Sequence, residues 1–310
     1  MIIKGIKNVL AQTWSRFCRL MIYVRQHPFK SLLFAAIAGF CSLFLFFLVI
    51  YLGAFGKLPT KAYLKSLKNP VTSTIYASNK EPIGYYYLQN RSNADSSQIK
   101  PPLIQALVAT EDSRFYEHRG IDYKSYARVL IKSIILQQNA GGGSTITQQV
   151  AKNLFGREQQ FFLSTPINKI REIFIARRLE SIYDKEDIIL LYFNTVSFGE
   201  NIYGIEKAAF RFFNKAPEEL TLPESATLAG LLKAPSYYNP RNFPERAEQR
   251  RNVVLSQMLK YDYITPETFE EAQTPLKLNY QTPKKVSSFS AYFKDYVATE
   301  FALWAEDNPA

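Results

Sequence analysis

The sequence predicts a mainly α-helical domain with a small β element, preceded by one membrane-spanning helix. An uncharged apolar run fills residues 31–56, and helical periodicity with short loops extends from residue 101 to about residue 259. Strand-like alternation is confined to residues 71–92. Hydrophobic residues make up 47% of the 310 residues, which is enough to build a core and argues against wholesale disorder.

The apolar run is the first element of the chain. The stretch from Leu32 to Leu52 would extend about 32 Å as a helix, which is long enough to cross a bilayer core. Residues 1–30 carry six basic and no acidic side chains, so the positive-inside rule places the N-terminus in the cytoplasm and everything after Lys57 outside. A cleaved signal peptide is the alternative, but its apolar stretch would be only ~7–15 residues long. We expect a single-pass protein of the cell (inner) membrane.

Two short strands are expected next, on either side of residues 79–82. Each later helix is expected to begin at a helix-start or chain-break signal. These signals lie at Pro101–Pro102, after Gly120, near Ser144 and at Thr165–Pro166. One core stripe is expected to carry Leu103, Leu107 and Thr110, and another Ile167, Ile170, Phe174 and Ile182.

The expected organisation has five parts. They are a cytoplasmic basic tail (1–30), a transmembrane anchor (31–56), a membrane-proximal β and linker segment (57–100), the main domain (101–260) and a C-terminal linker (261–310).

Composition excludes several classes of protein. Two cysteines and two histidines are too few for a disulfide scaffold, a Cys/His zinc site or a catalytic design that needs several histidines. The net charge of +11 is compatible with nucleic acid, an anionic membrane or an anionic substrate. Export and the lack of a nucleic-acid-binding motif argue against the first. Residues 123–178 hold nine basic and two acidic side chains, which favours an anionic substrate bound there.

The segment Glu111–Gly120 gathers three carboxylates, a histidine and aromatic rings at a helix end. A carboxylate beside Phe115 and Tyr116 would be partly desolvated and could accept a proton. Taken alone, the segment reads more simply as a solvated helix end with local ion pairs. His118 reads as a structural hydrogen-bonding residue.

The segment Gly142–Asn153 places glycines and hydroxyls before a helix, where free backbone N–H groups attract anions. Lys152 would add a positive charge, although a flexible loop with a capping box from Thr145 to Gln148 explains the same pattern. The spacing of a P-loop is absent, so no nucleotide site is indicated. In a third segment, which contains Glu172, the only basic side chain at helical spacing from Glu172 is Lys169, three residues before it. Taken alone, this segment is interpreted as a solvated helix face.

Together these segments resemble the peptidoglycan glycosyltransferase family. EDxxFxxHxG matches Glu111–Gly120, and GGSTxTQQxxKN matches Gly142–Asn153 at every fixed position. The third motif matches over 168–180, except that Asn168 stands where the family has arginine; Lys169 or Arg171 would compensate. The fourth and fifth motifs match at Lys185–Asn194 and between Glu206 and Pro235. The resemblance runs from about residue 72 to about residue 258 and implies a lysozyme-like glycosyltransferase fold.

The segment Ser290–Val297 is similar to the linker that follows this domain in class A penicillin-binding proteins. The chain therefore looks like the anchor and glycosyltransferase part of such a protein, with the transpeptidase part absent. An SxxK match at Ser97–Lys100 precedes the first motif and no KTG follows, so we interpret it as chance.

The resemblance implies polymerisation of lipid II, with Glu111 as the general base and Glu172 orienting substrate or holding a divalent cation. Mg²⁺ or Mn²⁺ is a family expectation, and no organic cofactor is expected. Expected partners are lipid II, the growing glycan strand, the membrane and proteins of the cell-wall synthesis machinery, but not nucleic acid. The implied substrate-binding residues are Asp112, Phe115, Gly143, Ser144, Thr145, Gln148, Gln149, Lys152, Asn153, Lys169, Arg171 and Asn194.

Two alternative functions and the role of one apolar stretch stay open on the sequence. A lysozyme-like glycan hydrolase also uses carboxylates, and a non-catalytic cell-wall scaffold would need none. The apolar stretch of Phe155, Phe161, Phe162 and Leu163 is either a surface that dips into the membrane or ordinary core.

Overall fold

The computed structural model describes residues 25–65, 73–76, 82–86, 94–132, 142–157 and 163–275, together with residues 296, 300 and 304. The chain divides into two units, Met1–Leu58 and Pro59–Ala310, which are described separately below. The patch residues Phe161 and Phe162 and the linker segment Ser290–Val297 lie outside the described residues, except for Tyr296.

The first unit contains helix α2, Pro28–Tyr51. Pro28 stands in its first turn, where a missing N–H breaks no helical hydrogen bond. Among the described residues, this is the one helix long and apolar enough to cross a membrane. The predicted apolar helix is confirmed, although it begins before residue 31 and ends before residue 56. Its orientation in a membrane stays a prediction.

The second unit begins with the short helix α3, Lys61–Lys65, and an antiparallel hairpin of β1, Ser73–Tyr76, and β2, Pro82–Tyr86. Thr74 pairs with Tyr85, and the register shifts between Ile75 and Tyr76. The two strands expected around residues 79–82 are therefore confirmed.

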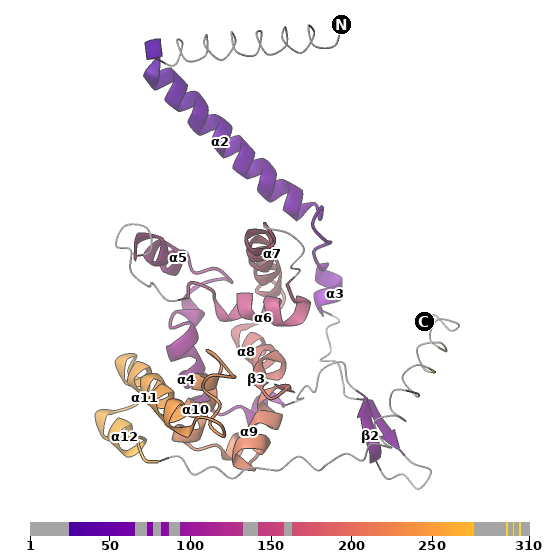
Figure 1. The fold of residues 1–310 in the computed structure, drawn as a ribbon, viewed down its shortest axis with the longest axis vertical. Helices are drawn as coiled ribbons and strands as arrows, with labels where there is room; N and C mark the ends of the chain where they lie inside the picture. The colour runs from indigo at the N-terminus through magenta and orange to yellow at the C-terminus, as the bar shows by residue number, and fades with distance from the viewer. Residues whose placement is uncertain are drawn as a thin grey trace, which may run out of the picture. The chain divides into compact units, whose positions relative to one another are not determined.

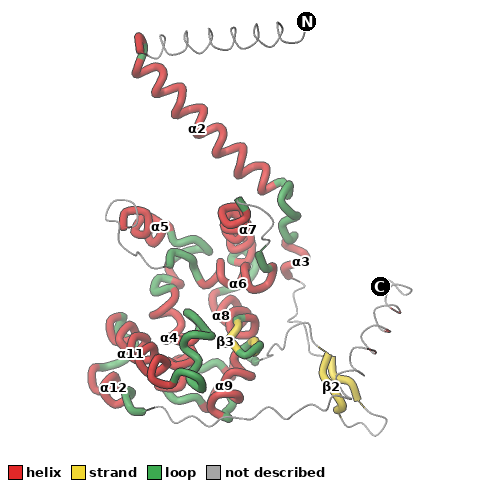
Figure 2. Tube along the Cα trace, viewed as in Figure 1, coloured by secondary structure: helices red, strands yellow, loops and turns green. Residues whose placement is uncertain are grey.

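The rest of the unit is helical (Figure 1). Its helices are η1 Ser96–Gln98, α4 Pro101–Glu111, η2 Phe115–Glu117, α5 Tyr123–Leu130, α6 Ile146–Phe155, α7 Ser164–Leu179, α8 Lys185–Thr195, α9 Ile205–Phe213, η4 Pro217–Glu219, α10 Leu222–Leu231, α11 Pro244–Lys260 and α12 Pro266–Glu271. Figure 2 shows how little strand accompanies them. The predicted mainly α fold with a small β element is confirmed.

A second hairpin was missed by the sequence analysis, which expected only helices and loops after residue 166. Strand β3, Ser197–Gly199, pairs with β4, Ile202–Tyr203. Glu200 and Asn201 form the connection, both with positive φ (49° and 58°), as a tight hairpin turn requires. Such short strands carry too little alternation to be read from a sequence.

Two groups of helices build the domain. Helices α4, α10 and α11 pack together through a core of small and branched side chains, and α6 packs against both α7 and α8. The first core consists of Ala106, Ala109, Ala226, Ala229, Val254, Leu255, Met258 and Ala272. The alanines let the helix backbones approach closely, which fixes the position of the C-terminal end of α4.

The predicted core stripes are partly correct. On α4, Leu103 and Leu107 are buried, whereas Thr110 is only half-buried. On α7, Ile167 and Ile170 are buried while Phe174 is half-buried, and the stripe continues through Ile175, Ala176 and Leu179. Ile182 follows the helix and is half-buried.

Candidate active site

Glu111 is the last residue of α4, and its side chain is oriented by a chain of hydrogen bonds. Gln149 Nε2 donates to Glu111 Oε2 at 3.0 Å, and the Tyr192 hydroxyl donates to Gln149 Oε1 at 3.2 Å. Burial raises the pKa of Tyr192 well above its usual value, and the charge of Glu111 raises it further. The hydroxyl therefore keeps its proton at neutral pH, and α6 and α8 together position a half-buried carboxylate.

Asp112 connects the end of α4 to the start of α6. Its Oδ2 accepts from the backbone N–H of Ile146 at 3.0 Å and lies 3.0 Å from His118 Nε2. The carboxylate is buried and meets the positive end of the α6 dipole. Asp112 and His118 thus hold the first and second motifs together, which agrees with a structural role for His118.

Gly120 brings the first motif against two other segments. Thr145 Oγ1 donates to the Gly120 carbonyl at 2.8 Å. Gly120 has a φ of +82°, and a Cβ there would lie 3.0 Å from the Ala176 carbonyl oxygen. A residue with a side chain would push α7 away, so the glycine allows the three segments to meet.

The start of α6 has the predicted capping box. Gln148 N–H donates to Thr145 Oγ1 at 3.2 Å, and Thr145 N–H donates to Gln148 Oε1 at 3.3 Å. Gln148 Oε1 also accepts from the Tyr126 hydroxyl and from Lys169 Nζ, and Lys169 Nζ donates to Ser144 Oγ at 2.5 Å. The capping box therefore orders the start of α6. Lys169 adds a positive charge at this end of the helix.

Glu172 is buried among cations. Lys169 Nζ lies 3.2 Å from Glu172 Oε2, and Arg157 Nε donates to Oε1 at 2.7 Å. Burial lowers the pKa of Lys169; the charge of Glu172 opposes this, whereas Arg157 and Lys152 add to the lowering. Two cations therefore contact this carboxylate and a third lies near one of them, which leaves an excess of positive charge in this region.

The surroundings of Glu172 do not fit a resident metal ion. Both of its oxygens contact cationic groups, and no group of three His, Cys, Asp or Glu side chains converges among the described residues. Mg²⁺ and Mn²⁺ prefer several oxygen ligands, so the expected divalent cation gains no support from these side chains.

A cavity of about 250 Å³ lies between the end of α4 and the glycine loop. Glu111, Gly143 and Ser144 line it, and Gln257 and Lys260 enter from α11. The residues of the first two motifs thus share one cavity, with the candidate base on its wall.

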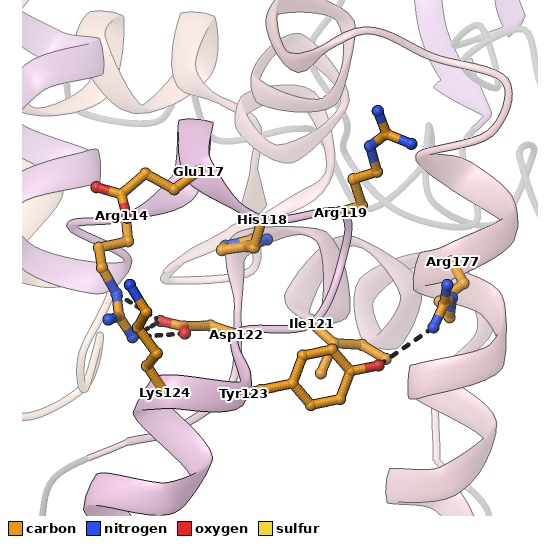
Figure 3. A pocket seen from close by; sticks show the side chains of 9 residues that line it. All are labelled: Arg114, Glu117, His118, Arg119, Ile121, Asp122, Tyr123, Lys124 and Arg177. Atoms are coloured by element: carbon orange, nitrogen blue, oxygen red, sulfur yellow. Dashed lines mark hydrogen bonds and ion pairs between the residues drawn. The ribbon is translucent and has the colours of Figure 1, made fainter.

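Asp122 also lines a second cavity of about 380 Å³, whose lining side chains are drawn in Figure 3. Arg114 pairs with Asp122 through two nitrogens, and Arg177 donates to the Tyr123 hydroxyl at 3.2 Å. Burial alone would raise the pKa of Asp122, but hydrogen bonds from Arg114 and Ser125 outweigh it and lower the pKa to about 2. Neither Glu111 nor Glu172 lines this cavity.

Several predicted site residues lie outside this constellation. Phe115 is fully buried, with Lys185 Nζ 4.3 Å from its ring centroid, and Asn194 is buried and donates to the Ala94 carbonyl at 3.0 Å. Both support the fold, so direct substrate contact by either is unsupported. Asn153 is half-buried on α6, and its Nδ2 has no hydrogen-bond partner among the described residues.

Two further expectations concern arginine and the apolar patch. Arg157 supplies a guanidinium that contacts Glu172, and the predicted substrate-binding residue Arg171 is half-buried on α7. Of the apolar stretch, Phe155 is half-buried and Leu163 is 38% exposed, which leaves both interpretations of it as predictions.

Three residues were missed by sequence reasoning: Arg157, Tyr192 and Arg250. Arg250 is buried on α11; burial lowers its pKa, and the negative charge of Glu111 opposes this lowering. Tyr192 stands within the fourth motif match and could have been found there. Arg157 is 15 positions from Glu172, and Arg250 is far along the chain from Glu111. Neither distance matches a helical or strand repeat, so only the tertiary structure reveals these two arginines.

The fold and site define a class: a mainly helical domain in which a half-buried carboxylate lines a cavity and cationic side chains contact a second, buried carboxylate. The comparison with protein families agrees, because the family described as Transglycosylase matches residues 79–259, and the chain belongs to that family. This confirms the resemblance inferred from the motifs.

Known relatives carry the name penicillin-binding protein 1A. The protein from Escherichia coli (strain K12) is 39% identical over 246 residues, covering 79% of this chain and 28% of the relative. That from Aquifex aeolicus (strain VF5) is 40% identical over 269 residues, covering 86% of this chain and 36% of the relative. The crystal structure of the Haemophilus influenzae protein is 26% identical, with a TM-score of 0.42, and the match covers 74% of this chain and 24% of that one. The chain thus spans about a third of the length of these relatives.

Proposed function

We propose that this chain is a peptidoglycan glycosyltransferase that polymerises lipid II into β-1,4-linked glycan strands and releases undecaprenyl pyrophosphate. The observation that carries the proposal is Glu111, which is held by the uncharged Gln149 on the wall of a cavity that Arg128, Lys132 and Lys260 also line. A candidate base and cationic side chains in one cavity suit transfer from a pyrophosphate donor.

In the proposed reaction, Glu111 accepts the proton of the 4-hydroxyl of the acceptor GlcNAc. The hydroxyl oxygen attacks C1 of the donor MurNAc, the bond from C1 to the pyrophosphate oxygen breaks, and the configuration inverts. Gln149 holds one Glu111 oxygen, so the other is directed at the acceptor.

The leaving pyrophosphate gains negative charge as the bond breaks. Lys169 and Arg157 both contact Glu172, and Lys152 lies near enough to Lys169 to lower its pKa. Positive groups held in place before the reaction stabilise such charge most effectively. Glu172 would keep two of these cations in position rather than accept a proton.

The substrate carries a lipid tail, and α2 supplies a helix able to cross a membrane. The basic residues before α2 support a cytoplasmic N-terminus and an extracytoplasmic domain in the inner membrane. Proteins of the cell-wall synthesis machinery are proposed as partners because they would act on the same polymer.

The test is incubation of the full chain with lipid II in detergent, followed by separation of the products by size. Polymer with release of the lipid carrier supports the proposal. Cleavage of an added glycan without polymer supports the hydrolase alternative. If neither polymer nor cleaved glycan forms, the scaffold alternative is supported. The Glu111→Gln variant serves as the matched inactive protein.

A further inference from the structure

An exposed cluster of two aromatic rings and one arginine stands at the beginning of α11. Arg246 Cζ lies 4.5 Å from the ring centroid of Tyr237 and 4.4 Å from that of Phe243. Tyr237 is nevertheless 53% exposed and Phe243 38% exposed. The guanidinium holds both rings in place while much of their surface stays open to solvent. We call these three residues the aromatic cluster.

Helix α11 connects the aromatic cluster to the cavity at Glu111. Arg246, Arg250, Val253, Gln257 and Lys260 recur at helical spacing and so share one face of α11. Gln257 and Lys260 line the cavity, and α11 packs against α4, whose last residue is Glu111 (Figure 1). Arg246 and Gln257 are about 16 Å apart along the helix axis.

The middle of this face is also ordered. Arg250 Nε donates to the Gly230 carbonyl at 3.3 Å, and its guanidinium lies 5.9 Å from the Tyr238 ring. Tyr238 packs edge-on against Tyr237, with the ring centroids 4.9 Å apart. A series of contacts therefore leads from the exposed rings to the buried arginine that feels the charge of Glu111.

We propose that the aromatic cluster is a distal saccharide subsite, which stacks sugar rings of the glycan strand while the end of that strand reacts at Glu111. The identity of the strand rests on the proposed function. Sugar rings present apolar C–H faces that pack on aromatic surfaces, and the arginine can donate to acetamido or carboxylate oxygens. A rigid platform loses little conformational entropy on binding, which suits a polymer that must be held and then moved.

The occupant follows from position and chemistry. Arg246 of the aromatic cluster lies on the same face of α11 as Gln257 and Lys260 of the reaction cavity, so a molecule that reaches both the cluster and the cavity must be extended. A glycan strand is extended and polar, and its rings match exposed tyrosine and phenylalanine. A protein partner would have no need of the continuous face toward Glu111, and the following test separates it from sugar.

The experiment measures binding of a fluorescent, lipid-free GlcNAc–MurNAc tetrasaccharide to the full chain carrying Glu111→Gln, which prevents turnover. The added double change Tyr237→Ala with Phe243→Ala is expected to raise Kd about tenfold. Tyr237→Phe keeps the ring and should bind as the parent does. Tyr123→Ala removes another exposed ring, on α5, and controls for general loss of aromatic surface.

Three results would overturn the subsite: no binding by the parent, an unchanged Kd in the double variant, or the same loss with Tyr123→Ala. Thermal unfolding checks the fold, and if the double variant unfolds, Tyr237→Leu replaces it because leucine keeps apolar packing without a flat ring. With lipid II and Glu111 intact, the variant should start chains at the parental rate but make shorter strands. If the parent makes no polymer but binds the tetrasaccharide more tightly than the double variant does, the proposed function is wrong and the subsite stands. If the parent polymerises lipid II and the double variant has the same Kd and strand length as the parent, the subsite is wrong and the proposed function stands.

Discussion

Glu111 and Glu172 are two carboxylates of one domain in opposite surroundings. Glu111 is half-buried on a cavity wall, and its hydrogen bond comes from the neutral amide of Gln149. Glu172 is buried, and its two oxygens meet the cationic groups of Lys169 and Arg157. Both side chains are held by hydrogen-bonded partners, so what distinguishes them is the charge of those partners.

This difference assigns the two carboxylates different chemistry. Both oxygens of Glu172 are engaged in ion pairs, whereas Glu111 accepts from a neutral amide on a cavity wall, where in the proposed reaction it meets the acceptor hydroxyl. The pattern resembles other enzymes in which environment divides roles between paired carboxylates. Each prediction below changes one side of this comparison.

The largest effect is expected from Glu111→Gln, which removes the base and keeps the size of the side chain. The rate of lipid II polymerisation should fall about 10³-fold. Thermal stability should stay close to that of the parent, since the amide oxygen can still accept from Gln149. A variant that polymerises as fast as the parent would show that Glu111 is not the base.

Arg157→Ala tests the cationic side and should lower kcat/KM for lipid II about 10- to 100-fold, because a charge-assisted contact is lost. Arg157→Lys should recover part of that loss. Arg119→Ala, on the exposed wall of the second cavity, is the matched control for loss of one positive charge. Equal effects of Arg157→Ala and Arg119→Ala would mean that only the overall charge matters.

Tyr192→Phe tests the orientation of Glu111 without touching any charge. Loss of the hydroxyl releases Gln149 Oε1, and we expect kcat to fall by roughly tenfold or less, with a smaller change in KM. Steady-state kinetics on lipid II separates the two constants. A change confined to KM would contradict an orienting role.

Asp122→Asn is expected to affect activity least and stability most clearly. The pKa of Asp122 is about 2 in the folded protein and 3.8 ordinarily, so its ionised form, which Arg114 and Ser125 hold, contributes about 2 kcal/mol of stability. A lowered carboxyl pKa stabilises the fold above pH 3.8, and this contribution is lost as the pH falls toward 2.

Urea unfolding of parent and variant at pH 7 and near pH 2 measures this effect. The difference in the free energy of unfolding should be present at pH 7 and small near pH 2. A difference that does not shrink in acid would mean that the variant acts through something other than the charge of Asp122. Together with Arg157→Ala, this separates an ion pair that supports the fold from one that serves the site.

Most of the fold could be predicted because local signals determined it. The apolar run gave α2, proline and capping residues gave the starts of α4 and α6, and the glycine run separated two helices. The exact end of α4, at Glu111, has no proline or glycine beside it to mark it in the sequence. Asp112 turns away there to bond the start of α6, which is a contact between distant segments.

The sequence alone determined the motifs, the identity of Glu111, Glu172 and Lys169, and the concentration of basic residues between positions 123 and 178. Only the tertiary structure decided which partner each carboxylate has. Arg157 reaches Glu172 across 15 positions, Tyr192 reaches Glu111 through Gln149, and α11 links the aromatic cluster to the reaction cavity. Such contacts form when helices pack, and because packing joins residues without regard to their spacing, no local pattern encodes them.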